Sequence, residues 1–100
     1  MTPDWLLGTW RLMRADASLD FAPGVRMEFL DDGRLHYHVD VGGKGQLIGL
    51  LYRVDGDVLV TDNPATPHSM SVRIEPGAGD LLLMDFGGAH AMLVRERPLR

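Results

Sequence analysis

The sequence contains no cysteine, and this absence removes several kinds of chemistry at once. Without thiols the chain forms no disulfide bond, no thiolate zinc site and no iron–sulfur cluster, and it has no thiol nucleophile. This composition is compatible with a reducing compartment.

Positive charge is also scarce. Lys44 is the single lysine, and lysine and arginine together supply 10 positive charges against 14 acidic residues, a net charge of −4. A protein that binds nucleic acid without sequence preference needs a basic face, because contacts to phosphates dominate its affinity. We therefore expect no nucleic-acid partner.

Long apolar runs are missing as well. A helix that crosses a bilayer needs about 20 consecutive apolar residues, and the apolar stretch near the N-terminus is interrupted by Gly8 and Arg11. That stretch also lacks the basic start of a signal peptide. We expect no membrane insertion and a cytoplasmic location.

The chain has 100 residues, of which 45% are hydrophobic and 24% charged. These values are typical of an ordinary globular protein, and the length fits one domain over residues 1–100.

Short turn signals rich in glycine, aspartate, asparagine and proline occur at even intervals. Between them apolar and polar residues alternate with period two, which is typical of strands with one buried face. The predicted strands, the first preceded by one short helical turn, are 5–15, 25–31, 34–41, 46–54, 57–62, 68–75, 80–86 and 89–97.

Most connections between these strands are short enough for hairpins, so strands adjacent in sequence are expected to pair antiparallel. Eight such strands form either a sandwich or a closed barrel, and closure removes the exposed edges. We predict an all-β fold, a single small eight-stranded antiparallel up-and-down barrel. A barrel of this size is filled by its own side chains or holds one small ligand.

The first predicted strand contains the string LGTWRL at residues 7–12, and the last contains LVRER at 93–97. A Gly-x-Trp at the start of such a barrel, followed by a basic residue and leucine, resembles the lipocalin/calycin superfamily, particularly intracellular fatty-acid-binding proteins and small bacterial lipocalin-like domains. The resemblance implies that Arg95 or Arg97 packs over Trp10 at the closed end of the barrel. It also implies that a small apolar or weakly anionic molecule binds inside. Gly8 is expected to allow a close approach of the neighbouring chain.

The alternation places methionine and aromatic side chains on the predicted interior. Such side chains suit a small apolar guest, and tyrosine hydroxyls supply the few polar contacts of a pocket. The predicted lining consists of Met27, Phe29, Tyr37, Tyr52, Met70, Met84 and Met92. Whichever of Arg95 and Arg97 does not close on Trp10 is a candidate to hold an anionic head group.

His36 and His38 point to the same side of a strand, as in His-x-His metal sites. The other face of that strand is the more apolar one, so we expect both histidines to face solvent. A third ligand must come from an adjacent strand, and the sequence places neither His68 nor His90 there. We predict no metal site and no cofactor.

Two other functions stay open. The predicted strand 46–54 is apolar on both faces, and 81–84 less clearly so. A filled barrel could therefore be a structural or protein-interaction module, with a homodimer formed through these outer faces. An enzyme on the same scaffold would need an interior acid or base, which only Tyr37, Tyr52 or a misassigned histidine could supply.

Overall fold

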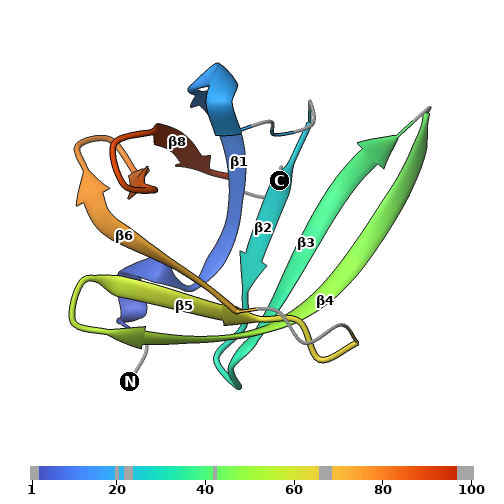
Figure 1. Cartoon of the computed structure of the whole chain (residues 1–100), viewed down its shortest axis with the longest axis horizontal. Helices are drawn as coiled ribbons and strands as arrows, with labels where there is room; N and C mark the ends of the chain where they lie inside the picture. Colours follow the sequence, from blue (N-terminus) through green and yellow to red (C-terminus); the bar gives the residue numbers. More distant parts are fainter. Residues whose placement is uncertain (1–2, 20, 22–23, 42, 66–68, 97–100) are drawn as a thin grey trace.

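A computed structural model describes residues 3–19, 21, 24–41, 43–65 and 69–96 of the chain. It contains eight strands and two short 3-10 helices, shown in Figure 1. In chain order they are η1 (Asp4–Leu6), β1 (Gly8–Ala15), η2 (Ala17–Leu19), β2 (Arg26–Phe29), β3 (Arg34–Val41), β4 (Lys44–Asp55), β5 (Val58–Asp62), β6 (Ser69–Gly77), β7 (Leu81–Asp85) and β8 (His90–Arg95).

Each strand pairs antiparallel with the next, and β8 pairs with β1 to close the barrel. The predicted fold class is therefore confirmed. The strand ends match the predicted ones to within two residues, except that β1 begins at Gly8, after the short helical turn of η1. No helix among the described residues is long and apolar enough to cross a membrane.

Strand β1 contains an irregularity that keeps its apolar residues inside. Its register against β8 shifts between Leu12 and Arg14, so Met13 is an extra, bulged residue that is 56% exposed. Because of this shift, Leu12 and Ala15 both pack against the core although they are three residues apart. A bulge also increases the local twist of the strand, which favours closure of a small barrel.

The interior is filled by the chain's own side chains. Among the residues that the structure describes, all the buried ones are hydrophobic and none is charged. The buried cluster consists of Leu6, Trp10, Val25, Met27, Phe29, Leu35, Tyr52, Val54, Leu59, Val72, Ile74, Leu82, Met84, Ala91 and Leu93.

One end of the barrel is closed by Trp10 and Arg95. The Trp10 side chain is 1% exposed, and its Nε1 donates to the Leu6 carbonyl of η1 at 2.8 Å. The Arg95 guanidinium lies 4.4 Å from the centre of the Trp10 ring, a cation–π arrangement. Its Nη1 donates to the Leu7 carbonyl at 2.6 Å, and its Nη2 donates to the carbonyl of Trp5. The expected arginine–tryptophan contact is confirmed with Arg95, and Arg97 lies outside the described residues.

The predicted close approach at Gly8 is confirmed too. Gly8 has a φ of +114°, and a Cβ there would lie 2.9 Å from Arg95 Nη1. A glycine is needed at this point for both its backbone conformation and its lack of a side chain.

The opposite end is covered by the connection after β1. This connection contains η2, which the sequence pattern did not predict. Leu19 and Phe21 pack against the core, and the Phe21 ring meets Phe86 edge-on with centroids 5.9 Å apart. Leu19 and Phe21 therefore pack on the barrel itself.

A candidate binding groove on the outer face

The predicted ligand-lining residues do not form one cavity. Met27, Phe29, Tyr52 and Met84 belong to the buried cluster, and the Phe29 and Tyr52 rings pack edge-on at 5.1 Å. The Tyr52 hydroxyl donates to the Leu30 carbonyl at 2.5 Å. These side chains fill the interior in which the resemblance places a ligand.

Tyr37 and Met70 lie nearer the surface. Tyr37 is half-buried against the core, and this burial raises the pKa of its hydroxyl, so the neutral form is favoured. Met70 is 46% exposed near the start of β6, although Val72 and Ile74 on the same face are buried. The prediction of an interior Met70 is wrong, because the inward face of the strand reaches the barrel rim there.

The prediction of an interior Met92 is also wrong. Ala91 and Leu93 are the buried residues of β8, so Met92 between them faces outward. The segment Ala91–Val94 is apolar on both faces. Alternation therefore does not decide which face is buried, and only the register against β7 and β1 does.

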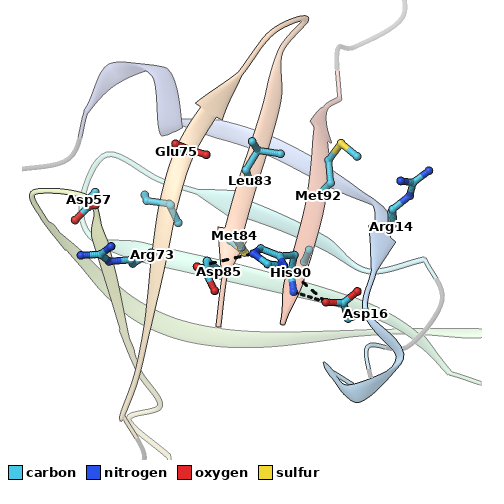
Figure 2. Close-up of a pocket in the computed structure, with 12 residues that line it drawn as sticks. Arg14, Asp16, Asp57, Arg73, Glu75, Leu83, Met84, Asp85, His90 and Met92 are labelled. Carbon is cyan, nitrogen blue, oxygen red and sulfur yellow. Dashed lines mark hydrogen bonds and ion pairs between the residues drawn. The ribbon is translucent and has the colours of Figure 1, made fainter. Parts of the chain in front are cut away.

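A hollow of about 540 Å³ lies across the outer face of β6, β7 and β8, and Figure 2 shows the side chains around it. Its volume is within the range of about 300–1,000 Å³ typical of small-molecule sites. We call it the β6–β8 groove. Its lining residues are Arg14, Asp16, Asp57, Arg73, Ile74, Glu75, Leu83, Met84, Asp85, His90, Ala91 and Met92.

One row of groove residues has an apolar middle and charged ends. Strand pairing places Glu75 opposite Leu83, Leu83 opposite Met92, and Met92 opposite Arg14. In Figure 2 these four side chains follow one another across the strands. Leu83 and Met92 are half-buried and offer an apolar surface in the middle of the row.

A second row, beside the first, consists of an arginine, an aspartate and a histidine. Arg73, Asp85 and His90 are opposite one another on β6, β7 and β8. The His90 ring lies between two carboxylates, with Nδ1 3.9 Å from Asp16 and Nε2 3.9 Å from Asp85. The backbone N–H of His90 donates to Asp16 Oδ2 at 2.7 Å, and the Asp16 N–H donates to the His90 carbonyl at 2.9 Å. These bonds fix the end of β1 to the start of β8.

Asp85 is held in its charged form. The backbone N–H of Gly88 donates to Asp85 Oδ1 at 2.8 Å and is the main cause that lowers the pKa of this carboxyl, with His90 and Arg73 adding to it. The groove lining as a whole contains four carboxylates against two guanidinium groups. Its field therefore favours a positively charged ligand group.

A different part of the surface is apolar. Leu47 and Leu51 on β4 are 57% and 47% exposed, and Ile48 on its other face is 39% exposed. The prediction that strand 46–54 is apolar on both faces holds for these residues. A homodimer through this surface stays a prediction.

A scan against protein-family models gave no match, and a search of curated proteins gave none either. The resemblance to the lipocalin/calycin superfamily therefore rests on the sequence pattern alone.

Proposed function

We propose that this chain is a non-catalytic small-molecule-binding protein of lipocalin-like architecture, which holds its ligand in the β6–β8 groove. The observation that carries the proposal is the apolar surface of Leu83 and Met92 beside the ionised carboxylate of Asp85. The interior is the less favourable place for a ligand, because the buried cluster occupies it. A cytoplasmic location remains part of the proposal and is compatible with the lack of cysteine.

The chemistry of the groove specifies the class of ligand. An apolar body would cover Leu83 and Met92, while a positively charged group would face the carboxylates of Asp85 and Asp16. A weakly anionic ligand, which the resemblance implies, is disfavoured by the excess of carboxylates. Arg95 is poorly placed to bind an anionic ligand, because two of its nitrogens donate to carbonyls at the closed end. We therefore propose a small amine with an aromatic or aliphatic body.

The methionine methyl groups allow a direct test by NMR. Selectively ¹³C-methyl-labelled protein is titrated with 2-phenylethylamine and, separately, with phenylacetate, which has a similar body and the opposite charge. We expect the amine to shift the Met92 methyl signal in a saturable way. Met27 in the core and Met13 on β1 should stay unchanged. Phenylacetate should bind at least about tenfold more weakly, because the carboxylates repel it.

The matched variants are Asp85→Asn and Asp31→Asn. The amide introduced by Asp85→Asn would keep an oxygen to accept from Gly88 and lose only the charge, so amine affinity should fall by about tenfold, the effect of one charge-assisted hydrogen bond. Asp31 lies in the β2–β3 turn, away from the groove, so its variant should bind as the parent does. A shift of Met27 in place of Met92 would move the ligand to the interior and refute the groove. Equal binding of both probes, or no shift with either, would also refute the proposal.

A further inference from the structure

Two histidines and a glutamate meet on the outer face of β2 and β3. His36 and His38 are on β3, and strand pairing places Glu28 of β2 opposite His36. All three side chains are half-buried or partly exposed, and they point away from the core. Glu28 is the adjacent-strand group that the sequence alone did not reveal. We call this set the Glu28–His36–His38 cluster.

The possible donor atoms of the cluster are almost as close to one another as the donor atoms around a single metal ion. Glu28 Oε1 lies 3.5 Å from His36 Nδ1 and 3.9 Å from His38 Nε2. Three donor atoms, one from each residue, all lie within 4.8 Å of one another. Donors bound to one tetrahedral zinc ion at 2.0–2.2 Å are about 3.4 Å apart. Metal binding therefore requires side-chain rotations that bring these atoms closer by at most about 1.4 Å.

The surroundings leave room for a cation and for a further ligand. Gly49 lies opposite His36 on β4, and a Cβ placed there would touch nothing within 4 Å. The residue opposite His38 on β2 is Arg26, whose guanidinium is paired with Glu96 at 3.1 Å. Its charge is therefore partly compensated and opposes a bound cation less strongly.

We propose that the Glu28–His36–His38 cluster binds one divalent transition-metal ion, with zinc as the reference ion, and leaves at least one coordination position open to solvent. Two imidazoles and one carboxylate are the donor set that suits zinc and neighbouring metals and disfavours magnesium or calcium. This site is separate from the β6–β8 groove, since β2–β3 and β6–β8 are different parts of the barrel wall.

His90 provides an internal comparison. It also lies between two carboxylates, but Asp16 faces its Nδ1 and Asp85 faces its Nε2. A single metal ion on one ring nitrogen of His90 would therefore not reach both carboxylates. Histidine and carboxylate groups thus converge on one point at β2–β3, whereas at β8 the two carboxylates lie at different nitrogens of one ring.

Isothermal titration of tag-free protein with zinc chloride in a non-chelating buffer tests the proposal. We expect one zinc ion per chain, and cobalt(II) at the same site should show the visible absorption of a four- or five-coordinate ion. His36→Ala, His38→Ala and Glu28→Gln should each weaken zinc binding by at least tenfold, since even loss of an outer-shell partner costs about 10–100-fold. His90→Ala should bind zinc as the parent does. Circular dichroism establishes that each variant is folded.

Several outcomes would overturn the site. Absence of zinc binding by the parent at millimolar concentration is one, and parent-like binding by the histidine variants is another. If Glu28→Gln alone retains parent affinity, the three-residue cluster is refuted in favour of a histidine pair. Loss of binding in His90→Ala would place the ion elsewhere. None of these results depends on amine binding in the groove, so the two proposals fail separately.

Discussion

Gly8 and Arg95 are far apart in the sequence, yet the position of the Arg95 side chain requires that residue 8 has no side chain. The glycine allows Arg95 Nη1 to lie where a Cβ would be 2.9 Å away, and from there Nη1 reaches the Leu7 carbonyl. The guanidinium also lies on Trp10. Gly8 and Trp10 were expected from the short string near the start of the chain, whereas the arginine was expected only as Arg95 or Arg97, and the structure assigns the contact to Arg95. The outward position of Met92 was not expected, because its strand is apolar on both faces.

This arrangement predicts that Gly8→Ala is more harmful than a matched glycine substitution. Gly88 has a φ of +110°, close to the +114° of Gly8, but a Cβ at Gly88 would touch nothing within 4 Å. Gly8→Ala and Gly88→Ala should each lose about 1–3 kcal/mol of stability from backbone strain. Gly8→Ala should lose about 1–3 kcal/mol more, because Arg95 is displaced from its carbonyl partners. Urea denaturation followed by circular dichroism measures the difference, and equal losses would contradict the assigned contact.

At the scale of elements, the turns determined how well the strands were predicted. Glycine and aspartate mark most hairpins, so the strand ends came out nearly as observed. The bulge at Met13 and the short helix η2 were missed, because neither has a periodic signal within so few residues. The Glu28–His36–His38 cluster was missed for a related reason. The i, i+2 histidines were visible, but their third partner depends on the β2–β3 register.

The connection that contains η2 should be held mainly by its apolar contacts with the barrel. Phe21→Ala removes the edge-on contact with Phe86 and exposes the end of the core. We expect faster amide hydrogen exchange at Leu19, whose N–H donates to the Asp16 carbonyl at 3.0 Å. The loss of global stability should stay below about 3 kcal/mol, because Phe21 is only half-buried.

Phe21→Leu is the control, since it keeps an apolar side chain and loses only the aromatic geometry, which is worth about 0.5–1.5 kcal/mol. Hydrogen-exchange mass spectrometry reads the local effect, and thermal denaturation reads the global one. Unchanged exchange at η2 in the alanine variant would show that the connection is held by other contacts.

At the scale of the whole molecule, closure of the barrel brings together segments that are far apart in the sequence. The β6–β8 groove combines the end of β1, the β4–β5 turn and three later strands, and it exists only because β8 pairs with β1. The barrel fold was predictable from strand number and turn spacing. Whether that barrel is filled or hollow was not, since it depends on how side chains of eight strands meet, and the buried cluster shows the filled state.

A filled barrel should become a binder of apolar guests only when a core side chain is removed. Leu93 is fully buried on β8, where it lies opposite both Leu12 and Leu82. Leu93→Ala should cost about 2–5 kcal/mol and leave an apolar cavity of the kind that takes up benzene or xenon. Benzene should then raise the melting temperature of the variant and shift the Met27 and Met84 methyl signals, because a ligand that binds only the folded state stabilises it.

The parent protein and Leu47→Ala, which alters a residue that is 57% exposed, should show neither effect. Uptake of benzene by the parent protein, with a shift at Met27, would mean that the native interior already holds a cavity and would restore the barrel centre as the ligand site.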